Sequence, residues 1–216
     1  MKALPALLTA MSLLLPMSPG LADDLKVKIT GDLASVTVRH NGKDVTIQRN
    51  QNQSNTIAPA YAKTSRPCPP FCIQPVRIAP GVETIGELEV LDYLKRMSAG
   101  DDSIVVIDSR TPDWVKRGTI PGSINIPWTT LNLSRSDPFT ITEALEKKFN
   151  VHTLEGLYDF SGAKTLVLFC NGMWCGQSPN NIRSLLTVGY PADKIKWYRG
   201  GMQDWSAVGL TTVTPE

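Results

Sequence analysis

The chain has 216 residues, of which 42% are hydrophobic and 19% charged, which favours one well-buried globular domain over a fibrous or disordered chain. The formal charge is only +2, and no long run of like charge occurs. This charge pattern argues against a nucleic-acid-binding protein.

Residues 1–22 have the pattern of a secretory signal peptide, with one lysine before an apolar run and Gly-Leu-Ala at residues 20–22. Pro5 and Pro16 interrupt the run, which is shorter than the roughly 20 residues that a membrane-spanning helix needs. We therefore expect cleavage after Ala22 and a periplasmic or secreted mature protein without membrane association.

Residues 23–50 are predicted to form a small antiparallel β unit. Apolar and polar residues alternate in 24–30, 34–40 and 43–49, which predicts three strands. Asn-Gly between the last two is a strong signal for a tight hairpin. A ribbon this small has little core of its own, so we expect it to pack on the larger domain as an appendage, whose protein partner the sequence does not identify.

Residues 51–80 have no periodicity and are predicted to form a proline-rich linker. Cys68 and Cys72 lie in its centre, and their spacing permits a small disulfide loop. A zinc half-site is the alternative, but neither His40 nor His152 has ligand spacing to a cysteine, so we predict no metal site. In an exported protein, disulfide pairing is the simplest expectation for all four cysteines.

Helical and strand patterns alternate from residue 81 to residue 216. Helices are expected at ELEVLDYLKRM, ITEALEKKF and PNNIRSLLTVG, and buried strands at SIVVID, KTLVLFC and KIKWY. Continuous apolar strands separated by helices predict an α/β fold with a parallel sheet covered on both faces. Functional groups of such sheets lie at the carboxyl ends of the strands, where Cys170 is expected as a last strand residue.

The segment after this strand predicts a reactive thiol. Ser178 is a suitable N-cap and Pro179 suits a first helical turn, so a helix should begin there. Backbone N–H groups and the positive helix end would then favour a thiolate at Cys170. A buried cysteine that only packs is the alternative, against which the strand–loop–helix arrangement argues. The candidate substrate-binding loop consists of Asn171, Gly172, Met173, Trp174, Gly176, Gln177 and Ser178.

Three motifs between residues 81 and 213 resemble the rhodanese family. IVVIDSRTPDWVKRGTIPGSINIPW is similar to its first signature, LVLFCNGMWCGQS to its active-site loop, and KWYRGGMQDWSAVGL to its closing strand, Gly-Gly turn and helix. The resemblance implies a rhodanese-like sheet and a sulfurtransferase in which Cys170 holds a persulfide stabilised by loop amides. The implied partners are a small sulfur-containing donor and a thiol or cyanide acceptor, and no dissociable cofactor is required.

The resemblance also places Asp108 and Arg110 at a strand end near the loop, with a structural ion pair as the alternative. Family loops commonly run Cys-x-x-Gly-x-Arg-Ser, whereas Gln177 stands at the arginine position of a loop two residues longer. Without a loop cation, polysulfide or a small persulfide makes smaller electrostatic demands than thiosulfate. The missing guanidinium argues against a cysteine phosphatase. Thr119 replaces the signature histidine, and we expect it to be structural.

Cys175 leaves further hypotheses open. It could resolve a persulfide on Cys170 or close a disulfide with it. The second hypothesis is therefore a periplasmic dithiol redox protein, exchanging with Cys68 and Cys72, and the third is a non-catalytic binding module. Trp174 is expected to shield the sulfur, bind a hydrophobic donor or pack in the core.

Overall fold

The computed structural model describes residues 25–215, so the expected signal peptide lies outside the described residues. A five-stranded sheet in the order β3-β9-β8-β4-β5 forms the centre, and all neighbouring strands in it are parallel. Its strands are β3 (Glu83–Ile85), β4 (Ile104–Asp108), β5 (Ile124–Asn125), β8 (Thr165–Phe169) and β9 (Ile195–Tyr198). Two antiparallel hairpins lie outside it: β1 (Ser35–His40) with β2 (Lys43–Gln48), and β6 (His152–Leu154) with β7 (Leu157–Asp159).

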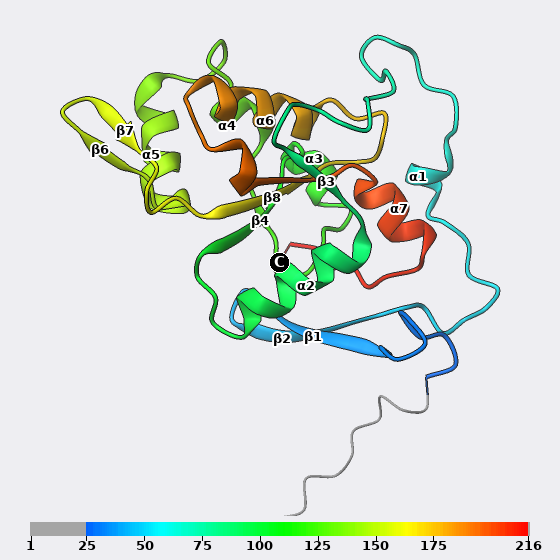
Figure 1. Ribbon diagram of the computed structural model, residues 1–216. Helices are drawn as coiled ribbons and strands as arrows, with labels where there is room; N and C mark the ends of the chain where they lie inside the picture. Colours follow the sequence, from blue (N-terminus) through cyan, green and yellow to red (C-terminus); the bar gives the residue numbers. More distant parts are fainter. Residues whose placement is uncertain (1–24, 216) are drawn as a thin grey trace, which may run out of the picture.

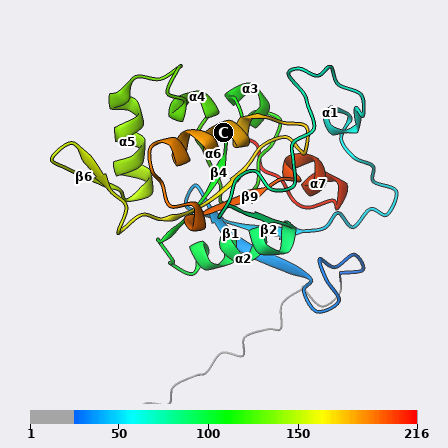
Figure 2. The ribbon, with the colours of Figure 1, turned by 45° about the horizontal axis from the view of Figure 1, so that its top comes forward.

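Helices cover both faces of the sheet (Figure 1). On one face lie α2 (Glu87–Ser98) and α7 (Gly201–Ala207), with hairpin β1–β2 beneath α2. On the other face lie α4 (Trp128–Leu131), α5 (Pro138–Phe149) and α6 (Gln177–Thr187), as Figure 2 shows. The remaining helices are the single turns α1 (Pro59–Ala62) and α3 (Pro112–Val115) and a 3-10 turn at Ala192–Lys194. The predicted α/β class, with a helix-flanked parallel sheet and a small antiparallel sheet, is confirmed.

Successive side chains of the central strands point alternately into two hydrophobic cores, one on each face of the sheet. In β4 and β8, Val106 and Val167 face the core that contains α2 and α7. Val105 and Leu168 face the core that contains α5 and α6. All four are buried, which explains why the sequence reads as continuous apolar runs without polar alternation.

The expectation of three strands before residue 50 is wrong, because only β1 and β2 form. Asn41 and Gly42 make the predicted tight turn, with φ values of 50° and 78°. The segment around Val27 stays irregular because the Gln51 side chain satisfies its backbone: the Val27 N–H donates to Gln51 Oε1 at 3.1 Å, and Gln51 Nε2 donates to the Val27 carbonyl at 2.9 Å. The Gln51 side-chain amide thus takes the place of the neighbouring strand that the alternation of apolar and polar residues predicted.

Hairpin β1–β2 shares the core of the large domain. Val38 and Ile47 are fully buried among residues of α2 and α7. The hairpin also joins the C-terminal tail, since the Thr211 N–H donates to the Gln48 carbonyl at 3.1 Å. The hairpin is therefore expected to contribute directly to the stability of the whole chain.

We predict that Ile47→Ala lowers the free energy of unfolding by about 2–5 kcal/mol, because it leaves a cavity between hairpin and helix. Denaturant unfolding measures this loss. Thr46→Ala, on the exposed face of the same strand, is the matched control and should change stability by less than about 0.5 kcal/mol. Equal stability of both variants would show that the hairpin does not unfold with the core.

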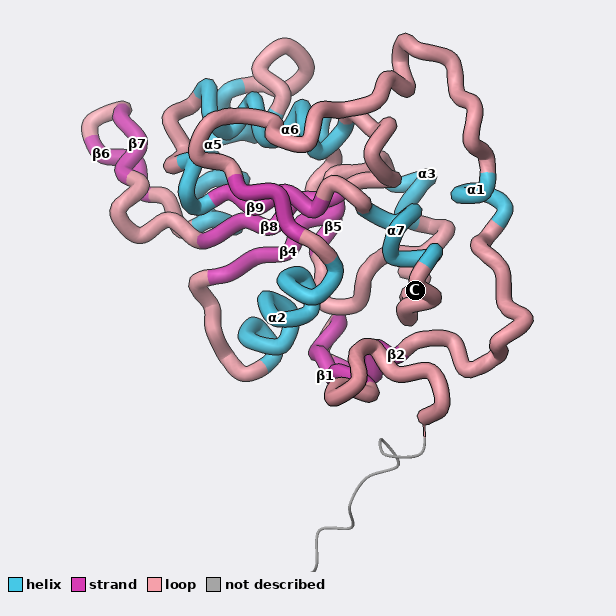
Figure 3. The backbone as a smooth tube through the Cα atoms, turned by 45° about the vertical axis from the view of Figure 1, so that its right-hand side comes forward, coloured by secondary structure: helices cyan, strands magenta, loops and turns pink. Residues whose placement is uncertain are grey.

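The linker, residues 51–80, leaves the hairpin and runs along the outside of the molecule past α1, which lies near α7 (Figure 3). Within residues 25–215, no helix is long and apolar enough to cross a bilayer.

Candidate functional site

The cysteine loop, residues 170–176, lies at the carboxyl end of β8. The strand ends at Phe169, so Cys170 is the first residue beyond it and not the last strand residue. The first turn of α7 holds the loop: the N–H groups of Met202 and Gln203 donate to the carbonyls of Cys170 and Asn171, both at 2.9 Å. Sheet and helix together thus fix the backbone that carries the sulfur.

The two loop cysteines lie together. The sulfurs of Cys170 and Cys175 are within bonding distance of each other, and the two Cα atoms are 6.3 Å apart. Both side chains are buried, with 3% and 4% of their surface exposed. The arrangement can close and open a disulfide, or pass a sulfur atom from one cysteine to the other.

Ser178 contacts the Cys170 sulfur directly. Its hydroxyl donates to Cys170 Sγ at 3.2 Å and accepts from the Trp197 indole N–H at 3.1 Å. The N-cap prediction for Ser178 is wrong, because α6 begins at Gln177 with Gly176 as its N-cap. The buried serine binds the sulfur from inside the first helical turn, and Trp197, which the sequence analysis missed, orients it.

We predict that Ser178→Ala slows alkylation of Cys170 at neutral pH by about fivefold to tenfold, measured in a Cys175→Ser background. A hydrogen bond to a charged acceptor stabilises it by roughly 1–1.5 kcal/mol, so its loss leaves less thiolate. Ser184→Ala is the control, since Ser184 is also buried in α6. An unchanged rate in Ser178→Ala would show that the hydroxyl does not support the thiolate.

The expected ring of backbone donors around the Cys170 sulfur is not formed in the described chain. The Cys175 N–H instead donates to the Gly172 carbonyl at 2.9 Å and closes a turn. The Cys175 carbonyl oxygen lies 3.4 Å from Cys170 Sγ, where it can accept from the thiol. Ser178 and the N-terminus of α6 are therefore the groups that can favour negative charge at this sulfur.

Asp108 and Arg110 form a buried ion pair, with Nη2 and Oδ2 2.6 Å apart and side chains at most 1% exposed. The guanidinium also donates to the Gly118 carbonyl at 2.7 Å and, from Nη1, to Asn171 Oδ1 at 3.3 Å. Thr119, as expected, is structural: its hydroxyl donates to Asp108 Oδ2 at 2.7 Å. The pair thus joins the end of β4 to the cysteine loop.

The electrostatics of this pair are set by burial and by its own contacts. Burial tends to lower the pKa of Arg110, but the hydrogen bonds and charge of Asp108 outweigh it and raise that pKa. Burial raises the pKa of the Tyr61 hydroxyl, which accepts from Arg110 Nη1 at 3.0 Å. The arginine is therefore charged wherever the protein is folded.

The linker packs against the cysteine loop. The Gln74 N–H donates to the Met173 carbonyl at 2.8 Å, and Arg199 holds the Gln74 carbonyl at 2.8 Å. Phe71 meets Trp174 edge to face at 5.6 Å between ring centroids. Cys68 and Cys72 close the expected disulfide loop beside these contacts, with Cα atoms 4.6 Å apart.

A pocket of about 310 Å³ opens beside the cysteine loop. Four aromatic side chains line it, and Gly176, Gln177 and Cys175 form part of its wall, whereas Cys170 does not. The aromatic residues are Phe71, Trp114, Trp128 and Trp174. Trp174 thus both packs and faces the pocket, which the sequence left open.

Three aromatic pocket residues, Phe71, Trp114 and Trp128, were not identified from the sequence, nor were Pro70 and Asn180. Phe71 lies between two cysteines in a proline-rich stretch, where a lone aromatic residue was the available signal. Of the predicted loop residues, Asn171, Gly176 and Gln177 line the pocket with Trp174. Within residues 25–215, no group of three or more histidine, cysteine, aspartate or glutamate side chains could hold a metal ion.

One curated protein is similar to part of the chain. A helix-turn-helix type transcriptional regulator of Mycobacterium tuberculosis is 26% identical over 119 residues, which are 55% of this chain and 41% of the regulator. The chain therefore matches less than half of that protein's length.

Two solved structures resemble the chain at low identity. A thiosulfate sulfurtransferase from Pseudomonas aeruginosa is 18% identical, over 62% of this chain and 21% of that one, with a TM-score of 0.41. A human single-domain sulfurtransferase is 24% identical, over 57% of this chain and 95% of that one, with a TM-score of 0.33.

The family assignment rests on residues 90–208, which match the rhodanese-like domain. This match covers more than half of the chain and includes β4, the cysteine loop and α7. The chain belongs to the rhodanese-like domain family.

Proposed function

We propose that this protein is a sulfurtransferase or sulfane-sulfur carrier that holds sulfur as a persulfide on Cys170. The observation that supports this best is the position of the Cys170 sulfur, just beyond β8, under the Ser178 hydroxyl at 3.2 Å. The carboxyl edge of a parallel sheet is where such folds place reacting groups. Family membership adds support, because rhodanese-like proteins include sulfurtransferases.

The proposed reaction has two displacement steps. In the first step the outer sulfur of a donor R–S–SH is transferred to the Cys170 thiolate, so that a new S–S bond forms and R–S⁻ leaves with the electron pair of the broken bond. An acceptor thiolate then attacks the outer sulfur of the Cys170 persulfide and leaves with it. The Cys170 thiolate is regenerated, and no external oxidant or reductant is consumed.

A dithiol redox function is the second candidate, favoured by the bonding distance between the Cys170 and Cys175 sulfurs. In that reaction a substrate dithiol would be oxidised to a disulfide while the Cys170–Cys175 bond is reduced to two thiols. Both functions use the same loop, but they differ in whether the number of sulfur atoms on the protein changes.

A donor panel separates the candidates. Purified wild-type protein, Cys170→Ser and Cys175→Ser are given thiosulfate, polysulfide or glutathione persulfide, with cyanide as acceptor, and thiocyanate is measured. We expect Cys170→Ser to turn over far more slowly than wild type with every donor. The double variant Cys68→Ser/Cys72→Ser is the control and should retain transfer. Wild-type turnover in Cys170→Ser would overturn the proposal.

Export is part of the proposal and is supported by the signal-peptide pattern of residues 1–22. Two cysteine pairs at disulfide distance suit an oxidising compartment. Expression of the full chain followed by N-terminal sequencing of the periplasmic fraction tests this. A mature N-terminus at Asp23 is the expected result, and an intact chain retained in the cytoplasm would contradict export.

A further inference from the structure

Cys175 lines the pocket beside the cysteine loop and Cys170 does not, although both side chains are nearly buried. We infer that Cys175 is the cysteine that exchanges sulfur with the external compound, and that this compound is an anionic thiol or persulfide with a flat apolar body. The inference rests on the proposed function, because it assigns the entry point and substrate class of that same site.

The walls of the pocket suit a flat apolar body. Trp174 lies 5.6 Å from Phe71 and 6.5 Å from Trp114 between ring centroids, and Trp128 completes the aromatic lining. These rings contact one another and form an aromatic wall, on which a ring or a planar conjugated group can pack. The volume, about 310 Å³, is that of a small-molecule site.

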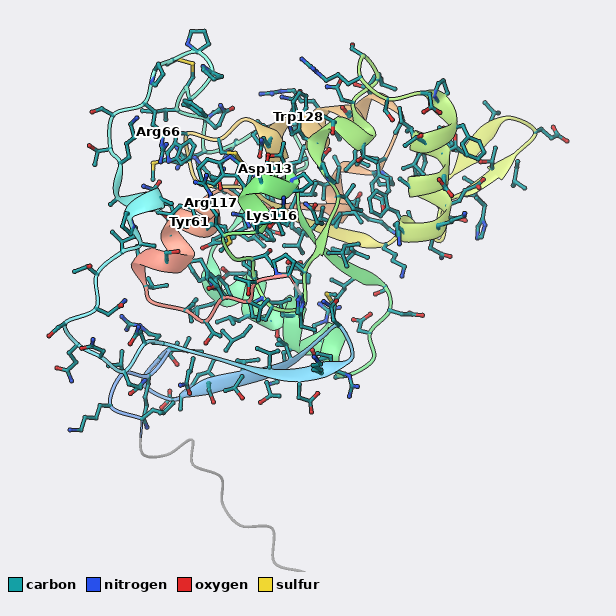
Figure 4. All side chains as sticks on the ribbon, turned by 180° about the vertical axis from the view of Figure 1, so that it is seen from behind. Tyr61, Arg66, Asp113, Lys116, Arg117 and Trp128 are labelled. Carbon is teal, nitrogen blue, oxygen red and sulfur yellow. A yellow bond between two sulfur atoms is a disulfide. The ribbon has the colours of Figure 1, made fainter. Side chains whose placement is uncertain are left out.

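Three arginines lie over aromatic rings that line the pocket, although they are not themselves lining residues. Arg66 lies 3.8 Å above the Trp174 ring centroid, Arg117 lies 4.7 Å from that of Trp114, and Arg135 lies 5.1 Å from that of Trp128. Arg66, Arg117 and Trp128 lie on the same side of the molecule in Figure 4, although they come from distant parts of the chain.

The charges around these rings favour an anion. Asp113, which precedes Trp114, is paired with Lys116 at 3.5 Å, so it does not cancel the three arginines. Arg66 Nε is buried and has no hydrogen-bond partner among the described residues, which leaves a donor for an anionic group. The linker thus places a cation on Trp174 of the cysteine loop, and the three guanidinium groups near the aromatic lining favour an anion over a cation.

The sulfur route follows from the positions of the two cysteines. The Cys175 thiolate attacks the outer sulfur of R–S–SH, forming Cys175–S–SH and releasing R–S⁻. The Cys170 thiolate then attacks that outer sulfur, so the persulfide moves to Cys170 and Cys175 returns to the thiolate. The Cα atoms of the two cysteines are 6.3 Å apart, so both side chains can reach the same transferred sulfur atom.

The same geometry directs attack on the oxidised loop. A substrate thiolate R–S⁻ attacks Cys175 Sγ, the Cys170–Cys175 bond breaks, and Cys170 leaves as a thiolate. The Ser178 hydroxyl donates a hydrogen bond to the Cys170 sulfur and so stabilises the negative charge of this thiolate. Because the better-stabilised thiolate is the better leaving group, attack at Cys175 is favoured over attack at Cys170.

Single-cysteine labelling tests the entry point. Cys170→Ser and Cys175→Ser are each reacted with the symmetric disulfide of para-mercaptobenzoate, which forms a mixed disulfide with the protein and releases one para-mercaptobenzoate. We expect Cys175 to be labelled at least about tenfold faster than Cys170, because access limits thiol reactivity. Reduced wild type, treated with limiting reagent and mapped by peptide mass, gives the same comparison without a substitution.

Two further disulfides test the substrate class in Cys170→Ser. Dithiodiglycolate carries the same charge without a ring, and cystamine is a cation. After correction for the rate of each reagent with free glutathione, the aromatic anion should react fastest and cystamine slowest. Adding Phe71→Ala should remove most of the aromatic preference, whereas Phe139→Ala, 76% exposed and outside the pocket, should retain it.

Equal or faster labelling of Cys170 would overturn Cys175 as the entry point. Equal rates for the aromatic and aliphatic anions, or a preference for cystamine, would overturn the substrate class. These readouts do not depend on persulfide formation. A chain that shows both preferences but never carries extra sulfur would contradict the proposed function and support this inference.

Discussion

Arg110→Met is expected to lower the free energy of unfolding by about 3–5 kcal/mol. The substitution leaves the carboxylate of Asp108 buried without its charged partner, although the Thr119 hydroxyl still donates to it. It also removes the donor to the Gly118 carbonyl. Denaturant unfolding of wild type and variant, fitted with a common slope, measures the loss.

Two further variants serve as controls for the Arg110→Met prediction. Arg96→Met breaks an exposed ion pair with Asp101 and should cost about 0–1 kcal/mol. The double variant Asp108→Leu/Arg110→Met removes both buried charges and should be more stable than Arg110→Met alone. If Arg110→Met cost no more than Arg96→Met, the buried pair would not support the fold.

Gly201→Ala is expected to reduce sulfur transfer by about 100-fold, because displacements near 1 Å at a reacting atom have effects of this size. Gly201 has a φ of 55°, a conformation that costs other residues roughly 1–2 kcal/mol. An added Cβ would overlap the Cys170 carbonyl oxygen and lie 3.0 Å from the Gly172 nitrogen. The backbone that positions the sulfur would therefore have to move.

Gly156→Ala is the matched control for this prediction. Gly156 also has a positive φ, 82°, but an added Cβ there has no atom within 4 Å. It should lose a similar amount of stability through backbone strain while transferring sulfur at the wild-type rate. Wild-type transfer by Gly201→Ala would show that close packing of α7 on Cys170 does not position the sulfur.

The central sheet and the place of Cys170 could be predicted because they depend on local sequence. The continuous apolar runs of β4 and β8 indicate strands buried on both faces, whatever packs on them. Asn41 and Gly42 likewise specify the hairpin turn by their own conformational preferences. The order and spacing of the motifs then suffice to recognise the family.

The remainder depends on contacts between distant segments, which local patterns do not encode. Residues 24–30 alternate like a strand, yet the Gln51 side chain satisfies the Val27 backbone. Ser178 has the preference of an N-cap, but the sulfur of Cys170 and the indole of Trp197 take its hydroxyl. Local propensity does not determine the structure where a tertiary contact provides a hydrogen-bond partner.

The linker is the clearest case in which the local sequence does not predict the tertiary contacts. Proline and cysteine content predict an irregular segment with a disulfide, and that segment is present. Nothing in its composition indicates that Arg66 stacks on Trp174 or that Phe71 lines a pocket with Trp128. Those contacts join residues far apart in sequence, so only the folded chain reveals that the linker forms part of the site.

The mass of one tryptic peptide shows directly whether Cys170 carries a persulfide. Trypsin cleaves after Lys164 and Arg183, so residues 165–183 contain both loop cysteines and neither linker cysteine. After reduction, exposure to a persulfide donor and rapid alkylation, we expect one additional sulfur atom, assigned by fragmentation to Cys170. A peptide that only loses two hydrogens, or a wild-type peptide whose additional sulfur stays on Cys175, would contradict it.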